Sequence, residues 1–338
     1  VFYLNEFIFN TDGGNEEDRL SFNGSGDTLT WFEQNSSGGT VAELTTSQGF
    51  RDPSAWYHIV VARDSTQGTA SNRIKLYVNG SQVTALGTAT YPSENDSSRF
   101  NTAVAHEIGA RNAGTFVNLY MSEVTFIDGS QLDATSFGEF DEDSGIFKPI
   151  DVSGLTFGDN GFYLDFENSG ALGADVSGNT NNFTVNNLTA IDQTTDTPTN
   201  NFATMNPLDN FFAAATFSEG NLKLVGTGTY TFNTSTIGLS TGKWYMEAKA
   251  TAQNNAVIGI MDKPSISVSN ELGYNTYGWE YKSGNGQIRG GASGGTLIDT
   301  YSTYANGDII GVYLDLDNNK LYFAKNGTIQ NSGTGISI

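Results

Sequence analysis

The sequence predicts an all-β protein made of two antiparallel β-sandwich domains of the jelly-roll kind, joined by a loop-rich connector. Apolar and polar residues alternate over short stretches such as 73–78, which is typical of strands with one buried face. Asn-Gly pairs follow two such stretches, at 79–80 and 326–327, and this pair is the strongest short hairpin signal. Helical periodicity is nearly absent, and the best helix candidate is one turn over 133–137 with Asp133 as its N-cap.

Composition divides the chain into three parts. We expect a first sandwich over 1–145, a connector rich in Asn, Thr and Asp over 146–208, and a second sandwich over 209–338. A Trp-Tyr pair opens a strand in each sandwich, at 56–57 and 244–245. Several short apolar stretches interrupt the connector, so we expect it to pack along a sandwich.

The charge balance excludes several classes of partner. The 338 residues include 16 Lys and Arg against 37 Asp and Glu, a formal net charge of −21. Nucleic-acid affinity depends on cations that displace counterions, so no nucleic-acid partner is expected. Membrane insertion is not expected either, because no apolar stretch reaches about 18 residues. The absence of Cys excludes disulfides, thiolate metal sites and cysteine nucleophiles.

Two regions resemble known domain families. Residues 56–63, 74–80 and 108–111 occur in the order that resembles the laminin-G, concanavalin A-like jelly roll, over about residues 1–130. From about residue 217 the chain resembles a SPRY domain, itself a bent β-sandwich. The stretches that carry this second resemblance are 242–247, 256–260, 277–281, 307–317 and 321–327. Against these families the opening strands of the first domain and the closing strand of the second are expected to be missing.

The segment between them resembles a connector of tailed (marine-type) bacteriophage structural proteins, where it follows a laminin-G-like domain. Its matching stretches are 126–129, 137–140, 175–179 and 196–202. The resemblance implies a virion fibre, spike, or capsid- or tail-attached adhesin on the particle surface. The implied partners are other virion proteins and a host-surface glycan or protein. Fibres are usually homo-oligomers, and a trimer is the expectation from that analogy.

Three functions therefore stand as hypotheses. The first is a non-enzymatic virion structural protein that displays β-sandwich modules for attachment. The alternative is a secreted, carbohydrate-binding lectin-like protein, and the less favoured third is a glycan hydrolase. No catalytic set is expected and the chain is predicted not to be an enzyme.

The hydrolase hypothesis depends on one acidic cluster. Glu139, Asp141 and Asp143 alternate, as the acid and nucleophile of a retaining glycosidase must when they share one strand face. Apolar partners of a core strand are missing, so a solvated acidic loop is favoured. His58 and His106 are the two histidines, and packed imidazoles are favoured over members of a hydrolytic triad.

No cofactor is expected, with Ca²⁺ as the one ion considered. Asp12, Glu16, Glu17 and Asp18 are candidate loop ligands by composition alone, since Ca²⁺ takes clustered oxygen donors. The acidic stretch 315–319 is interpreted as a strand-to-turn junction, where Asp and Asn satisfy local backbone groups.

One aromatic run is the candidate binding surface. Its members are Tyr274, Tyr277, Trp279 and Tyr281, and amphipathic rings supply much contact area at low entropic cost. Three of them share one parity, which favours a core-facing strand instead.

Overall fold

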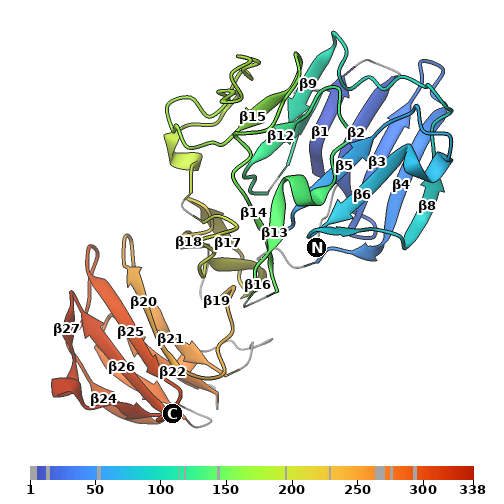
Figure 1. Ribbon diagram of the computed structural model, residues 1–338. Helices are drawn as coiled ribbons and strands as arrows, with labels where there is room; N and C mark the ends of the chain where they lie inside the picture. Colours follow the sequence, from blue (N-terminus) through green and yellow to red (C-terminus); the bar gives the residue numbers. More distant parts are fainter. Residues whose placement is uncertain are drawn as a thin grey trace. The chain divides into compact units, whose positions relative to one another are not determined.

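The computed structural model (Figure 1) describes residues 6–12, 16–51, 55–112, 114–117, 119–142, 145–194, 196–227, 230–262, 271–274, 277–291 and 295–338. The chain forms two compact units, Val1–Phe202 and Ala203–Ile338. Regular structure in the described ranges is antiparallel strand, together with short 3₁₀ turns. These turns are η1 (Ala70–Asn72), η2 (Ala134–Ser136), η3 (Ala190–Asp192), η4 (Leu272–Tyr274) and η5 (Asn331–Gly333). None of the described segments forms a helix with the length and apolar character needed to cross a membrane.

The first unit is built on a six-stranded sheet in the order β8–β4–β3–β2–β1–β9 and a three-stranded sheet β5–β6–β7. The large sheet comprises β1 (Glu6–Asp12), β2 (Glu17–Asn23), β3 (Thr28–Gln34), β4 (Thr40–Gly49), β8 (Leu86–Thr90) and β9 (Ala105–Ile108). The small sheet comprises β5 (Ile59–Arg63), β6 (Ile74–Val78) and β7 (Ser81–Gln82). Three two-stranded pairs complete the unit: β10 (Ala110–Arg111) with β11 (Thr115–Phe116), β12 (Val124–Phe126) with β15 (Phe162–Leu164), and β13 (Gly138–Phe140) with β14 (Phe147–Pro149).

Alternate residues of these strands form the core between the two sheets. Leu29 and Trp31 project from β3 toward Leu76 and Ile74 of β6, and all four side chains are buried. Burial of such apolar side chains contributes roughly 1.5–3 kcal/mol each. The sheets are therefore held together chiefly by their apolar inner faces.

The polar segment 146–202 belongs to the first unit and packs on it through aromatic residues. Phe162 on β15 stacks on Phe126 of β12 at 5.7 Å between ring centroids and meets the ring of Phe9 at 6.1 Å. Asn179 donates from Nδ2 to the backbone carbonyl of Gly158 at 2.6 Å. In this segment with few strands, an amide side chain thus satisfies a backbone group that a neighbouring strand would otherwise pair.

The second unit contains a β-sandwich preceded by two nested strand pairs. One sheet runs β20–β25–β26–β27 with β28 also on β26, and the other runs β21–β22–β23–β24. Their strands are β20 (Lys243–Lys249), β21 (Val257–Met261), β22 (Gly278–Lys282), β23 (Gln287–Gly290), β24 (Leu297–Thr300), β25 (Ile309–Asp315), β26 (Lys320–Lys325), β27 (Thr328–Ile329) and β28 (Ile336–Ser337). In the outer pair β16 (Met205–Phe212) lies beside β19 (Thr231–Ser235), and between them in the chain the hairpin of β17 (Ala215–Ser218) and β18 (Lys223–Gly226) forms the inner pair.

The core of this sandwich lies between its two sheets. Val312 of β25 and Phe323 of β26 face Tyr281 of β22 and Ile288 of β23, each at most 2% exposed. The central strands β22, β23, β25 and β26 thus bury residues of one side-chain row, which accounts for the alternation in these stretches of the sequence.

Local predictions are confirmed at several turns. Asn79 and Gly80 have φ of 47° and 78°, and Asn326 and Gly327 have 48° and 79°, the positive values that a type I′ hairpin turn requires. Asp133 caps η2, accepting the backbone N–H of Thr135. The all-β prediction with antiparallel sheets is confirmed.

Candidate functional site

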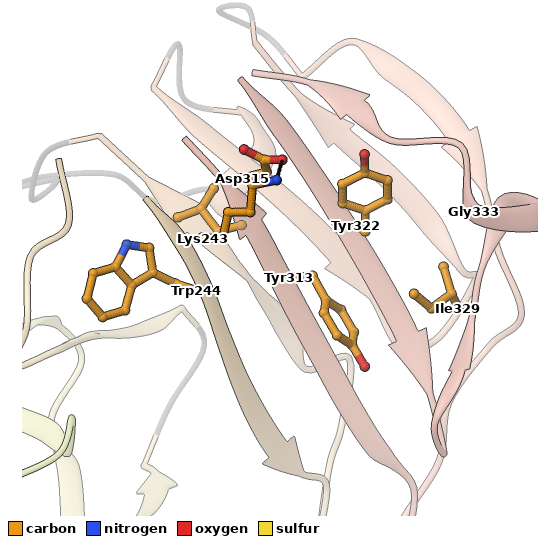
Figure 2. A pocket seen from close by; sticks show the side chains of 8 residues that line it. Lys243, Trp244, Tyr313, Asp315, Tyr322, Ile329 and Gly333 are labelled. Carbon is orange, nitrogen blue, oxygen red and sulfur yellow. Dashed lines mark ion pairs between the residues drawn. The ribbon is translucent and has the colours of Figure 1, made fainter. Parts of the chain in front are cut away.

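An open hollow lies on the β20–β25–β26 sheet of the second unit, and Figure 2 shows its lining. Its volume is about 290 Å³. Three strands of the sheet, together with β27 and η5, supply the lining residues: Lys243, Trp244, Tyr313, Leu314, Asp315, Tyr322, Ile329 and Gly333.

Strand alternation places the tyrosines of the hollow on the outer face. Val312 and Phe323 point into the core, so their neighbours Tyr313 and Tyr322, which are register partners, point the opposite way. Figure 2 shows the rings of Tyr313 and Tyr322 on this face beside Ile329. The outer surface of the sheet therefore carries an aromatic row beside the charged side chains of Lys243 and Asp315.

Gly311 of β25 leaves room on this face for the rings of two neighbouring tyrosines. A Cβ at Gly311 would lie 3.2 Å from the rings of both Tyr245 and Tyr313. These two rings lie 4.4 Å apart between centroids at an angle of 37°, and Tyr245 is 52% exposed. Two adjoining tyrosines thus present ring surface to solvent.

Polar groups surround this aromatic surface. Lys243 Nζ lies 3.2 Å from Asp315 Oδ2, and hydrogen bonding from Asn318 lowers the pKa of Asp315. The hydroxyl of Tyr245 donates to Glu247, which raises the pKa of that tyrosine. Exposed rings bordered by fixed charges and hydroxyls are features of a shallow site for an amphipathic ligand.

The four aromatics singled out in the sequence do not form one surface. Tyr281 is 0% exposed and packs in the core, with Trp279 partly buried against it. Burial raises the pKa of Tyr281 to about 12. Tyr277 is 41% exposed, and Tyr274 lies under the guanidinium of Arg289, 5.1 Å from its ring centroid. Tyr281 is thus inaccessible to a ligand in the folded unit, in agreement with the core interpretation.

The acidic cluster does not lie along one strand. Glu139 is exposed on β13, whereas Asp141 follows the end of that strand, in the turn toward β14, and pairs with Lys148 at 2.5 Å. Asp143 lies outside the described residues. The alternation required of a glycosidase strand is therefore not present at Glu139 and Asp141.

Both histidines are packed in the first unit. The ring of His58 lies 4.9 Å from that of Phe147, and His106 Nδ1 lies 2.9 Å from the carbonyl oxygen of Val104. Burial lowers the pKa of both imidazoles. The neutral form is favoured at both positions.

The described carboxylates among those considered for Ca²⁺ have protein partners. Glu16 pairs with Arg99, and Glu17 pairs with Arg19 and Arg111. The side chain of Asp12 is not described. In the described ranges, no group of three or more His, Cys, Asp or Glu side chains is arranged to hold a metal ion. In the stretch 315–319, Asp315 and Asp317 accept backbone N–H groups, as expected of a turn.

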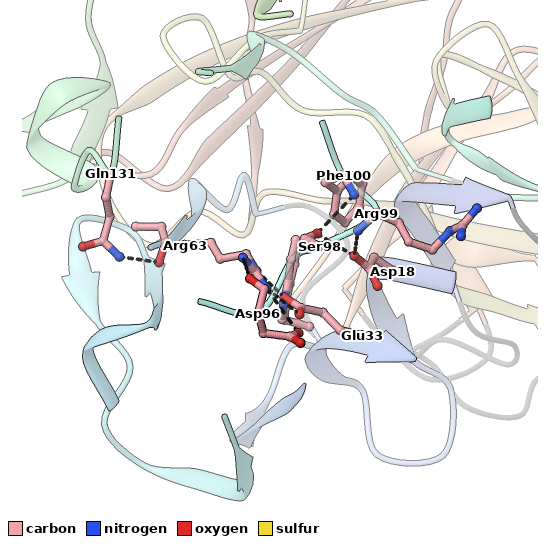
Figure 3. Close-up of polar contacts among 10 residues, drawn as sticks. Asp18, Glu33, Arg63, Asp96, Ser98, Arg99, Phe100 and Gln131 are labelled. Carbon is pink, nitrogen blue, oxygen red and sulfur yellow. Dashed lines mark hydrogen bonds and ion pairs between the residues drawn. The ribbon is translucent and has the colours of Figure 1, made fainter. Parts of the chain in front are cut away.

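A buried polar network in the first unit was not predicted from the sequence (Figure 3). Arg63 of β5 donates to both carboxylate oxygens of Glu33, at 2.7 and 3.1 Å, and Glu33 also accepts Trp31 Nε1 at 3.0 Å. Arg63 reaches the carbonyl of Asp96 at 3.3 Å as well.

Asp18 is the second buried carboxylate of this network and is 2% exposed. It accepts the hydroxyl of Ser98 at 2.5 Å and the N–H of Arg99 at 2.6 Å. Burial raises its pKa, and the charge of Glu33, its register partner, adds to the effect. These carboxylates are nearly inaccessible to solvent, so the network fastens β2, β3, β5 and the loop before β9 to one another.

Comparison with known proteins identifies the two regions. Residues 4–134 match the family model of the concanavalin A-like lectin/glucanases superfamily, and residues 243–335 match that of the SPRY domain. Among solved structures, the chain is similar to the SPRY domain of human HERC1 at 18% sequence identity, covering 38% of this chain and 83% of that one with a TM-score of 0.32. The comparison with curated proteins found no match. The two family matches support a concanavalin A-like domain over residues 4–134 and a SPRY-like domain over residues 243–335.

Proposed function

We propose that the chain is a non-enzymatic attachment protein that presents its two β-sandwich domains to partners at the surface of a bacteriophage particle. The open hollow, lined by the partly exposed Tyr313 and Tyr322 with the exposed Tyr245 beside Tyr313, is the observation that carries the binding role. Rigid sandwiches support such surfaces well, because their cores hold the strands while the outer side chains and loops remain free to vary.

The resemblance of residues 126–202 to the connector of tailed-phage structural proteins supports the virion placement. In this proposal the partners are other virion proteins and a host-surface glycan or protein, no cofactor is needed, and the chain assembles as a homo-oligomer. Mass spectrometry of purified particles tests the placement. A fixed copy number of the chain per particle supports it, whereas absence from washed particles overturns it.

Glycan recognition at the hollow is the second proposal, and the arrangement of Tyr245 and Tyr313 favours it. Sugar rings have one apolar face that packs on an aromatic ring, and hydroxyls that hydrogen-bond to charged groups nearby. Lys243, Asp315 and Glu247 supply such groups around these tyrosines.

A glycan array probed with the full chain tests the second proposal. We expect Tyr313→Ala to abolish the signal and Tyr277→Ala, an exposed tyrosine away from the hollow, to preserve it. A signal unaffected by Tyr313→Ala, or no signal on any array, contradicts glycan binding at this site without affecting the virion placement.

Our proposal that the chain is not an enzyme is tested by an assay for glycan hydrolysis. Polysaccharides incubated with the chain should release no sugar. If release occurs and survives the combined change Glu139→Gln and Asp141→Asn, the chain is an enzyme and the acidic cluster is not its catalytic pair.

A further inference from the structure

Strand β20 is the edge of its sheet among the described residues, and it carries three exposed apolar side chains. In the part of the chain that the structure describes, β20 pairs with β25 and with no other strand. Trp244 is 48% exposed, Tyr245 52% and Met246 41%, so both faces of this strand present apolar area to solvent. Exposed strand edges of this kind are templates for pairing with another strand.

Hydrogen bonds at the two ends of β20 establish which backbone groups face the open edge. Leu316 N–H donates to Gly242 C=O, and Ala250 N–H donates to Asp308 C=O, each at 3.0 Å. The register between these points has no shift, so the even-numbered residues of β20 bond to β25. In an antiparallel ladder the backbone N–H and C=O groups of the intervening residues point away from the partner strand. Lys243, Tyr245, Glu247 and Lys249 therefore direct their N–H and C=O groups outward.

The strands that precede β20 in the second unit pair with one another and not with β20. β16 pairs with β19, and β17 pairs with β18. We propose that β20 of a second copy of this chain occupies the open edge, running antiparallel across a two-fold axis at Tyr245.

Charge complementarity selects this register. With Tyr245 opposite its own copy, each Lys243 lies opposite Glu247 of the other chain, and each Trp244 lies opposite Met246 of the other chain. Moving the axis to Met246 preserves the backbone hydrogen bonds but places Lys243 opposite Lys249. Opposite charges across a pair of strands stabilise it and like charges destabilise it, so the register centred on Tyr245 is favoured.

The pairing has a definite stoichiometry. The same edge is used on both copies, so the interface closes at two chains and leaves no free edge on β20. The two β20–β25–β26 sheets then form one continuous sheet, and Trp244 and Met246 cover each other across the axis. A trimer cannot form through this edge.

Sedimentation equilibrium of the full chain gives the first test. We expect a concentration-dependent dimer. A monomer at all concentrations, or a trimer as the fibre resemblance implies, overturns the proposal and leaves the virion placement intact.

Charge reversal tests the register. Glu247→Lys replaces both attractive pairs by Lys–Lys contacts, and should weaken dimerisation by about tenfold or more. The double change Lys243→Glu with Glu247→Lys restores opposite charges and should restore the dimer. Failure of the double variant to dimerise, with its strand content and melting temperature unchanged, contradicts the pairing.

Crosslinking locates the axis, because the natural chain has no Cys. Residues in a hydrogen-bonded antiparallel pair have Cα atoms about 5.5 Å apart, within disulfide range. Under mild oxidation Tyr245→Cys should give a covalent dimer and Glu247→Cys should not. A covalent dimer from Glu247→Cys alone overturns this register.

Discussion

Arg63 and Glu33 form a two-point ion pair that joins the two sheets of the first unit. Glu33 lies on β3 of the large sheet and Arg63 at the end of β5 in the small sheet. The side chain of Glu33 is 2% exposed and that of Arg63 is 18% exposed. Such a pair costs desolvation energy when it forms, so its main effect is to fix how the sheets meet.

Loss of Arg63 should therefore destabilise the first unit strongly. Arg63→Met leaves the Glu33 carboxylate buried, with Trp31 Nε1 at 3.0 Å as its remaining side-chain donor among the described residues. Removing one partner of a buried pair costs about 3–5 kcal/mol. Urea unfolding of the full chain measures the loss in free energy of unfolding. Hydrogen exchange in β3 and β5 reports that loss for the first unit.

An ion pair whose carboxylate lies in solvent supplies the control in the same unit. Glu94 is 53% exposed and lies 3.6 Å from Arg73, whose side chain is 12% exposed. Arg73 keeps its hydrogen bonds to the carbonyls of Gln67 and Pro92 without Glu94, and a solvent-exposed carboxylate contributes about 1 kcal/mol or less to such a pair. Glu94→Ala should therefore be nearly neutral. Equal losses in the two variants would show that the Arg63–Glu33 pair is no more important than a surface contact.

Asp18 should make the stability of the first unit fall as the pH rises. Burial raises the pKa of its carboxyl above the ordinary value of 3.8, so the native state holds this proton at a pH where the unfolded chain has lost it. The free energy of unfolding then decreases with pH between 3.8 and the raised pKa. Asp18→Asn removes this dependence, so its stability relative to wild type should rise across that window. A stability difference between Asp18→Asn and wild type that stays constant with pH would contradict the raised pKa of Asp18.

Asp308 in the second unit should show the opposite dependence. The N–H of Ala305 and the side chain of Asn326 lower its pKa to about 2. The stability that this carboxylate contributes is present above 3.8 and is lost as the pH falls through about 2. Asp308→Asn should destabilise at neutral pH and match wild type at the acid end. Melting temperatures of both proteins over a pH series check this prediction. A destabilisation of Asp308→Asn that grows on acidification would contradict the lowered pKa of Asp308.

Gly286 should tolerate no side chain. Its φ is +69° and an added Cβ would lie 2.0 Å from the carbonyl oxygen of Tyr301. Gly327 has a φ of +79° with nothing within 4 Å of the added Cβ, so Gly327→Ala costs only the left-handed backbone strain of about 1–2 kcal/mol. Gly286→Ala should cost about 1–3 kcal/mol more than that. Thermal unfolding of both variants measures the difference, and equal melting temperatures would mean that Tyr301 moves aside freely.

Alternation and turn chemistry were sufficient to predict the strands, the two Asn-Gly turns and the capped turn at Asp133, because each depends on residues close in sequence. Alternation also placed Tyr277, Trp279 and Tyr281 on one core-facing row. The structure buries Tyr281 and partly buries Trp279, whereas Tyr277 precedes β22 and is 41% exposed. Alternation would place Glu280 in solvent, yet Glu280 is 0% exposed, because η4 covers it and Gly273 donates its N–H to Glu280 Oε2 at 2.7 Å.

The features that sequence patterns did not predict depend on partners far apart in the chain. Glu33 and Arg63 belong to different sheets, and the hollow joins Lys243 to Tyr313 and Tyr322. The outward parity of Tyr313, next to the core residue Val312, was the one available signal. Strand order was needed to bring these residues together, and the sequence pattern does not specify strand order.

The aromatic run of the second unit should divide into core and surface residues on mutation. Tyr281 is 0% exposed, and its hydroxyl donates to the carbonyl of Ser302. Tyr281→Phe loses that hydrogen bond at a cost of about 1 kcal/mol. Tyr281→Ala also leaves a cavity, and large aromatic truncations cost about 3–5 kcal/mol. Tyr277→Ala, at an exposed position, should cost about 1 kcal/mol or less. Unfolding of the full chain, followed by hydrogen exchange in β22, ranks the three variants. If Tyr277→Ala were as damaging as Tyr281→Ala, Tyr277 would belong to the core, and it could no longer serve as the surface control for binding at the hollow.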